Sequence, residues 1–413
     1  MRAAKQIRPQ YAQHFHCIAS ECEDSCCDGW TVSIDKETYK KYRHIPDSPL
    51  RVQLDENLLR SPRNADGSAP EIYATMRVLP SKRCPMHNEE DLCQIQVELG
   101  EQYLSELCAS FPRATVNIDN CNETTLSLSC PEAARIVLQS RNLLGAVDQQ
   151  TLTTLWDDRP GVLSMPLNYF WPIREFTVSL LLNRDYPLWQ RLFLLGTFSR
   201  RLEAVIRDAP QGDFPALESG FTQAIATGSL RASIDTIPVN IPLQLDLVLE
   251  LARKKSGIGN FRPRLDECWK SFLDGIGGEA LPFDKQCAAY SADYADVYAP
   301  FFLKHPQMLE NLLLNMVFRS LYPFGREGFE RPEAIEPTRI YALLVTEFAL
   351  IKGILIGVAG CRKDAFSPGD VVQTVQVITK HFQHNPRFVA VCLEMLAAKG
   401  LNNAHGLTML LRN

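Results

Sequence analysis

Residues 126–135 read LSLSCPEAAR, and two kinds of sequence meet there. Cys130 is the last of nine cysteines within the first 130 residues, whereas the rest of the 413-residue chain holds only four. Pro131 follows directly and suits the first position of a helix, where proline removes no intrahelical hydrogen bond. The sequence therefore predicts a mainly α protein in two parts. Residues 1–130 form a small cysteine-rich, metal-binding region with short strands, and residues 131–413 form a helical domain.

The helical part is divided by stretches rich in proline or glycine. These breaks separate candidate helices at 173–183, 187–207, 243–254, 306–321 and 338–358. In the fourth, apolar residues recur at helical spacing from Leu309 to Leu321, which predicts packing against other helices rather than a cofactor site. Residues after 131 are thus expected to build a helical core.

Two features of the sequence indicate where in the cell the protein lies. The most hydrophobic segment, residues 340–359, contains Glu347 and Lys352, and charges are costly in mid-bilayer. It therefore predicts a buried helix and no membrane span. The N-terminus is positively charged but lacks the apolar stretch of a signal peptide, so a cytoplasmic protein is expected.

Short elements are predicted in the N-terminal region. Apolar and polar residues alternate at 30–34 and 72–76, which is typical of strands. Asp35 suits the cap of a helix at 36–42, and the composition of residues 46–70 indicates a loop. An apolar stripe at 92–107 predicts a helix that Gly100 kinks and that Pro112 brings to an end.

The cysteines carry the strongest chemical signal. They form the groups Cys17-x4-Cys22-x3-Cys26-Cys27 and Cys84-x8-Cys93, followed by Cys108. In a long chain without a signal peptide, such clustering indicates metal binding rather than disulfides. Thiolates are soft ligands, and four of them suffice for a zinc site or a [4Fe–4S] cluster. The cysteines exceed what one centre needs, so some are structural or a second centre exists, with Cys121 and Cys130 as a possible further pair.

Other cysteines and motifs suggest no site. Lone cysteines are usually small buried apolar residues, and this is expected of Cys268, Cys287, Cys361 and Cys392. The histidines near the cysteines lack zinc-ligand spacing and are expected to be polar surface or loop residues: His14, His16 and His87. The glycine-rich segments 257–259 and 275–278 follow no apolar strand, so they predict loops rather than nucleotide sites. A net charge of −5 offers no basis for nucleic-acid binding.

Several motifs together resemble the flagellin lysine N-methylases, and the resemblance spans nearly the whole chain. The matching segments are Tyr11-x3-Phe15-x-Cys17-Ile18-x-Ser20-x-Cys22-Glu23-Asp24-x-Cys26-Cys27-x-Gly29-Trp30, Ile34-Asp35-Lys36-x-Thr38-Tyr39-x2-Tyr42, Leu92-Cys93-x-Ile95-Gln96-x-Glu98-Leu99-Gly100-Glu101, Leu104-x3-Cys108-x2-Phe111-Pro112-Arg113, residues 126–135, Leu309-Glu310-Asn311-Leu312 and Leu321-Tyr322-Pro323-Phe324. The Cys-x3-Cys-Cys core alone is also similar to a broader group of small zinc- or iron-chelating proteins.

The resemblance implies methyl transfer from S-adenosylmethionine to the ε-amines of surface lysines on flagellin, and a [4Fe–4S] cluster. By motif position the implied ligand candidates, of which any four could bind, are Cys22, Cys26, Cys27, Cys84, Cys93, Cys108 and Cys17. Radical enzymes typically carry Cys-x3-Cys-x2-Cys, whereas Cys27 here follows Cys26 directly. The cluster is therefore expected to be structural or to hold the cofactor in an unusual arrangement, and zinc is the alternative metal.

Polar methyl transfer requires a deprotonated lysine, which burial or a nearby base can supply. Candidate acid–base or substrate groups are Glu23, Asp24, Tyr39 and Glu310, for which turns, caps and salt bridges are the ordinary roles. Arg113 and Arg135 are expected to support the cluster or to pair with carboxylates. A cleft between the cysteine region and the helical domain is expected to bind the donor and the lysine.

Two other functions fit the same residues. One is a non-catalytic partner-binding protein with a structural metal clasp, and the other is an iron–sulfur oxidoreductase. Saturable binding of S-adenosylmethionine separates the methylase from the first, and a methylated product without net redox change separates it from the second.

Overall fold

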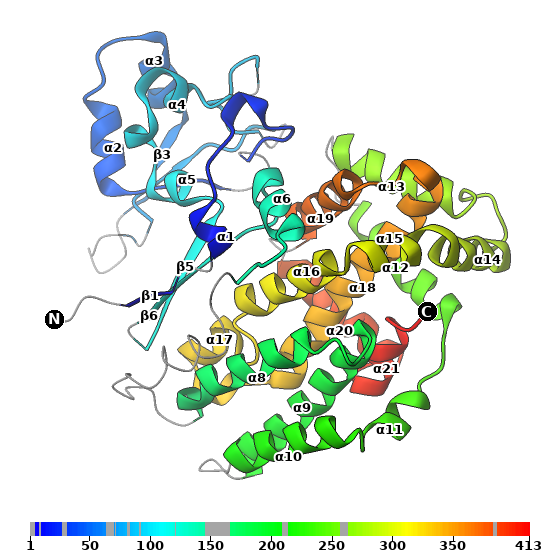
Figure 1. Cartoon of the computed structure of the whole chain (residues 1–413). Coiled ribbons are helices and arrows are strands. Elements are labelled where there is room, and N and C mark those ends of the chain that lie inside the picture. The colour runs from blue at the N-terminus through cyan, green and yellow to red at the C-terminus, as the bar shows by residue number, and fades with distance from the viewer. Residues whose placement is uncertain are drawn as a thin grey trace.

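The structure is a computed structural model, shown in Figure 1. It describes residues 5–7, 10–26, 31–62, 70, 72–80, 83–90, 92–119, 121–144, 166–208, 214–256, 263–382 and 386–413. Helices dominate these residues, as predicted. Metal binding by the cysteine-rich region remains a prediction.

A small antiparallel sheet organises the N-terminal part. Its strands are β2 (Ser33–Ile34), β4 (Ala74–Met76) and β3 (Leu58–Arg60), in the order β2-β4-β3. The first two lie within the predicted segments 30–34 and 72–76, although Trp30 is outside the described residues. Asp35 caps α2 (Lys36–Arg43) as predicted, because its carboxylate accepts a 2.8 Å hydrogen bond from the backbone N–H of Thr38.

The prediction of a loop over residues 46–70 was wrong for residues 49–60, and residues 63–69 lie outside the described residues. This segment contains α3 (Pro49–Asn57) and then β3. Ser48 caps α3 by accepting a hydrogen bond from the N–H of Arg51, and Pro49 occupies the first turn, where proline is favoured. Leu50 and Leu54 are buried on one face of the helix, so tertiary packing outweighs the loop-like composition.

The helix predicted at 92–107 is interrupted rather than merely kinked. Gly100 has a φ of +88°, a left-handed conformation that glycine adopts readily. The segment consequently divides into α4 (Gln94–Leu99), the 3₁₀ turn η2 (Glu101–Tyr103) and α5 (Glu106–Ser110).

A β-hairpin that was not predicted links the two parts of the chain. β5 (Arg113–Ile118) pairs antiparallel with β6 (Cys121–Leu126), and Ile118 pairs with Cys121 across the turn. β1 (Lys5–Ile7) adds a parallel strand to β6, and α1 (Gln10–Gln13) follows it. The signal in the sequence was the β-branched content on both sides of Asp119, whose φ of +52° is a turn conformation that aspartate tolerates.

The helical body confirms the five predicted long helices and contains further ones. The helices that match the predictions are α8 (Phe170–Leu182), α9 (Leu188–Asp208), α12 (Ile241–Ser256), α16 (Pro306–Arg319) and α18 (Pro337–Arg362). The others are α6 (Pro131–Gln139), α10 (Phe214–Thr227), α11 (Arg231–Asp235), α13 (Pro263–Gly275), α14 (Phe283–Asp293), α15 (Ala299–Lys304), α17 (Gly325–Glu330), α19 (Pro368–Phe382), α20 (Pro386–Ala398) and α21 (Ala404–Met409), with the π-helix η4 (Tyr294–Tyr298) between α14 and α15. Pro131 occupies the first turn of α6, as predicted.

The buried apolar residues form two separate cores. The small core extends from Val32 to Ile95, around the β2-β4-β3 sheet. The large core contains the helical body together with Tyr11, Phe15 and residues of the β5–β6 hairpin. Figure 1 accordingly shows α2, α3 and α4 grouped apart from the helical body, with β5, β6 and α1 between them. The domain boundary near residue 130 stays a prediction, and the cores divide at other residues.

Helix α18 is at the centre of the large core. Among the described helices it alone, as Pro337–Ala365, has the length and apolar composition of a membrane span, and 89% of its apolar window is buried inside the structure. Gly357 allows close approach to α13, because a Cβ atom there would lie 2.7 Å from the carbonyl oxygen of Phe272. Burial by other helices explains the hydrophobicity of the segment, as the prediction of a buried helix requires.

Lys352 introduces an amine into this core. Its Nζ donates a 2.5 Å hydrogen bond to the carbonyl oxygen of Leu411 and another to the side chain of Asn413, and burial lowers its pKa from 10.5 to about 7. Between pH 7 and 10.5, the unfolded chain therefore binds a proton that the folded chain does not.

We predict that the free energy of unfolding of the wild type, relative to that of Lys352→Met, increases by about 1.4 kcal/mol per pH unit within this window. Denaturant unfolding at several pH values measures it. Lys304→Met, at an exposed position, is the control and should follow the wild type. A pH-independent difference between wild type and Lys352→Met would show that Lys352 is charged in the folded protein.

Candidate metal centre

The loop of residues 22–26, here called the cysteine loop, contacts two parts of the structure. One is the helical body, and the other consists of the elements around the small core, here called the small body. On one side Ser25 Oγ is 3.0 Å from Nε2 of His87, in the small body. On the other side, side chains from α13 and α19 bind Glu23 and Asp24. Within the loop, the Cys22 thiol donates a 3.1 Å hydrogen bond to the carbonyl oxygen of Asp24. Cys27 lies outside the described residues.

Three more predicted ligands lie beside the small core. Cys84, Cys93 and Cys108 all pack against it and are half-buried. Cys93 stands at the N-terminus of α4, and Cys108 lies in α5, where Ser105 caps the helix by accepting a hydrogen bond from the N–H of Cys108. All three cysteines therefore lie around the same small core, and their joint binding of a metal stays a prediction.

Electrostatic interactions connect these thiols to the cysteine loop. Burial raises the pKa of Cys108 to about 12, although a hydrogen bond with the side chain of Ser105 lowers it in part. Negative charge on Cys93, Cys84 and Cys26 raises it further. Burial likewise raises the pKa of Cys93, the backbone N–H groups of Gln96 and Ile95 lower it, and Cys26 adds to the increase. Cys26 in the cysteine loop therefore interacts electrostatically with both Cys93 and Cys108.

Cys130 also interacts electrostatically with the cysteine loop; the sequence suggested it only as part of a possible further pair with Cys121 and not as one of the ligand candidates. Burial raises its pKa to about 12, the N–H groups of Ala133 and Glu132 lower it, and charge on Cys22 and Cys26 raises it. Its place at the N-terminus of α6 brings it towards the cysteine loop. The sequence held one signal for this, the Cys-Pro pair that starts the helix.

A metal group bound here would have to displace the protons of these thiols. Burial is the main cause of the raised pKa of Cys93, Cys108 and Cys130, and it raises the pKa of Cys268 in the large core in the same way. At neutral pH these thiols therefore remain protonated unless a cation compensates the charge of the thiolate. In the described part of the chain, no three His, Cys, Asp or Glu side chains are grouped closely enough to hold a single metal ion.

The remaining cysteines follow their predictions in part. Cys17 is exposed, and Cys121 is buried at the start of strand β6. Cys268 and Cys392 are buried, as expected of apolar residues, but Cys287 is only half-buried and Cys361 is exposed. The expectation of burial was wrong for Cys361 because it lies at the surface end of α18, beyond the part that the core covers.

The predicted acid–base groups mostly form ion pairs. Asp24 binds Lys380, and Glu23 binds Arg135 at 2.5 Å. Glu310 is buried and binds Arg191 and Arg184, each at 2.7 Å. Burial opposes its ionisation, but the hydrogen bonds from these arginines lower its pKa. These carboxylates therefore have the ordinary structural roles that were considered for them.

The other candidates have local roles. Tyr39 packs edge-to-face on Tyr73, with ring centroids 5.3 Å apart. Arg113 donates a 2.8 Å hydrogen bond to the carbonyl oxygen of Phe15 and lies over its ring. Arg135 pairs with Glu132 as well as with Glu23, so the expected pairing with carboxylates is confirmed for this arginine. His14 and His16 are exposed, as expected of surface residues.

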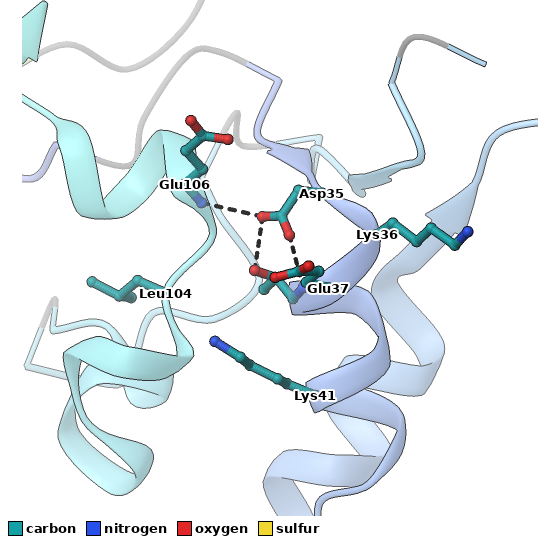
Figure 2. A pocket seen from close by; sticks show the side chains of 7 residues that line it. Asp35, Lys36, Glu37, Lys41, Leu104 and Glu106 are labelled. Carbon is teal, nitrogen blue, oxygen red and sulfur yellow. Dashed lines mark hydrogen bonds between the residues drawn. The ribbon is translucent and has the colours of Figure 1, made fainter. Parts of the chain in front are cut away.

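A pocket of about 390 Å³ lies between α2 and α5, lined by Asp35, Lys36, Glu37, Thr38, Lys41, Leu104 and Glu106. Figure 2 shows the carboxylate of Asp35 accepting a hydrogen bond from the backbone N–H of Glu106. This bond is 3.3 Å long, and the backbone N–H of Thr38 donates a second bond of 2.8 Å. Burial opposes ionisation of Asp35, but the hydrogen bonds from Thr38 and Glu106 lower its pKa. Asp35 thus joins α2 to the helix that carries Cys108. All seven lining residues belong to the cysteine-rich region, so this pocket is not the predicted cleft.

The second glycine-rich segment is a loop, as predicted. Gly277 and Gly278 have φ values of +91° and +86°, and the N–H of Gly278 closes the end of α13 by binding the carbonyl oxygen of Leu273. This is a helix C-terminal turn. Residues 257–259 lie outside the described residues.

Comparison with known proteins shows the family to which the chain belongs. The FliB lysine N-methylase C-terminal domain matches residues 174–410, from α8 to α21. The chain belongs to the FliB lysine N-methylase family. Its activity class is accordingly that of a protein-lysine methyltransferase.

Relatives extend the match beyond that domain. The lysine-N-methylases of Salmonella choleraesuis (strain SC-B67) and Salmonella typhimurium (strain LT2) are each 25% identical to it over 399 residues, covering 93% of both chains. The flagellar biosynthetic protein FliU of Salmonella muenchen is 33% identical over 155 residues, which cover 37% of this chain and 88% of FliU. No solved structure matches the chain.

The raised pKa values predict thiol reactivity in this FliB-family protein. In the folded, reduced, metal-free chain at pH 8, the exposed Cys17 should react with iodoacetamide at least about 100-fold faster than Cys108, because the thiolate is the reactive form. Peptide mass spectrometry gives both rates, and denaturant should abolish the difference. Equal rates in the folded chain would show that α5 does not shield Cys108.

Proposed function

We propose that the protein transfers methyl groups from S-adenosylmethionine to the ε-amines of surface lysines on flagellin. One observation carries this proposal: lysine-N-methylases match 93% of the chain, so the similarity includes the cysteine region as well as the C-terminal domain. The flagellar name of FliU, whose match is confined to a shorter part of the chain, supports a flagellar substrate.

We propose further that the cysteines hold a [4Fe–4S] cluster. Electrostatic interactions among described cysteines support this proposal for Cys22, Cys26, Cys84, Cys93 and Cys108, and also connect Cys130 to the cysteine loop. Cys27 and the exposed Cys17 remain candidates on the motif alone. When bound, the cluster would supply positive charge that keeps its cysteines as thiolates, and a centre for binding or reducing the methyl donor.

The chain's own residues would position the reactants. Glu23, Asp24 and Glu310 are occupied by cationic partners, so none of them is an available base for a lysine ammonium. In a polar transfer, removal of the lysine proton would therefore depend on burial of the amine, which lowers its pKa. The helical body would provide that burial, as the part that matches the methylase domain.

The function is tested with purified protein and flagellin. Under anaerobic conditions with S-adenosylmethionine, we expect mass shifts of 14 Da, or multiples of it, on flagellin lysines. Peptide mass spectrometry detects them, and omission of the donor should abolish them. Unmodified flagellin after incubation with a metal-loaded preparation would contradict the proposed substrate. A redox change without methylation would favour an oxidoreductase.

The cluster is tested by metal analysis of cysteine variants. Wild-type protein purified without oxygen should contain about four iron and four sulfide per chain. Cys93→Ser should lose most of this iron, whereas the matched control Cys392→Ser, in the large core, should retain it. Stoichiometric zinc without iron would contradict the cluster and favour a structural zinc clasp. Equal iron in both variants would exclude Cys93 as a required ligand.

A further inference from the structure

Asp24 attaches the cysteine loop to the helical body. Its carboxylate oxygens lie 2.9 and 3.0 Å from Nζ of Lys380, in α19. The same Nζ donates a 2.7 Å hydrogen bond to the carbonyl oxygen of Ser25. Both charged side chains are only 14% exposed, so solvent weakens this ion pair less than an ordinary surface pair.

Gln376 adds a second attachment from the same face of α19. It lies one helical turn before Lys380 and is fully buried. Its Nε2 donates to Oδ2 of Asp24 at 2.7 Å and to the carbonyl oxygen of Ser129 at 3.0 Å. One amide group thus connects the cysteine loop with the residue that precedes Cys130. Asp24, Lys380 and Gln376 are called the Asp24 network below.

Glu23 strengthens the attachment beside this network. Arg264, in α13, donates a 2.9 Å hydrogen bond to its carbonyl oxygen, and Arg135, in α6, binds its carboxylate. Helices α6, α13 and α19 of the helical body therefore contact the consecutive residues Glu23 and Asp24. The cysteine loop that holds them has no regular secondary structure. Side-chain contacts, rather than a backbone ladder, determine where this loop lies.

We propose that Asp24, Lys380 and Gln376 are positioning residues that hold the thiols of Cys22 and Cys26 in a fixed place relative to the helical body. Lys380 and Gln376 lie within the matched methylase domain, and Asp24 lies outside it. The network thus fixes the cysteine thiols relative to the domain that carries the family's name. Its catalytic consequence rests on the proposed function, whereas its effect on the loop is a property of the metal-free chain.

The loop is tested by alkylation of Cys22 in the full-length, reduced, chelator-treated protein. Lys380→Met and Asp24→Asn should each increase the iodoacetamide rate at Cys22 at least about tenfold, because each releases the loop. The double variant should react no faster than the faster single variant, since both changes disrupt one network. Unchanged rates, or independent additive increases, would overturn the proposal.

Matched controls separate loop release from unfolding. Lys399 pairs with Asp246 and Glu250 elsewhere in the helical body, so Lys399→Met should leave the Cys22 rate unchanged. Cys392 is fully buried and reports opening of the whole chain. If Lys380→Met also exposes Cys392, the loop substitution Asp24→Asn, which retains the shape of the side chain, decides the question.

Kinetics then test the catalytic consequence. With flagellin as substrate, both variants should lower kcat roughly tenfold and leave KM nearly unchanged, because the network positions groups without binding substrate. An increased KM with unchanged kcat would overturn the positioning role. If the wild type fails to methylate flagellin, the proposed function is wrong while the alkylation result still stands. If it methylates and the Cys22 rate does not respond, only the network proposal is wrong.

Discussion

Three buried amide side chains join the helical body to the segment that starts with β6. Asn315 donates to the carbonyl oxygen of Leu126, Asn311 to those of Val137 and Ser140, and Gln376 to that of Ser129. Each amide is buried, and a buried donor without its acceptor costs about 1–3 kcal/mol. These bonds fix the end of the hairpin and α6 between α16 and α19. The placement of Cys130, and of the cysteine loop that binds Gln376 through Asp24, depends on them.

The long helices were predictable because their signals are local. Apolar spacing and flanking proline or glycine define α16 and α18 without reference to the rest of the chain. Helix α3 was missed because it is short and polar in composition, and its stability comes from burial of Leu50 and Leu54. The β5–β6 hairpin was missed because its packing surface comes from helices that are distant in the sequence.

The candidate site was predictable only in composition. Soft-ligand chemistry identified the cysteines, and the structure brings Cys26 within electrostatic range of Cys93, Cys108 and Cys130. The roles of Asp24 and Glu310 were left open because their partners are far away in sequence. Lys380 lies 356 positions beyond Asp24, and no local pattern indicates such a pair. Because Asp24 and Glu310 each form an ion pair, neither carboxylate is free to take a proton from a substrate lysine.

We propose one account, in which the N-terminal cysteines hold a cluster beside the helical body, to which the Asp24 network attaches the cysteine loop. Iron anomalous diffraction from crystals of the anaerobically purified protein tests it most directly. The account predicts a strong iron peak bounded by Cys26, Cys84, Cys93 and Cys108, next to the loop that Asp24 holds on α19. A crystal with these cysteines ordered and no iron among them, or with iron elsewhere in the chain, would contradict it.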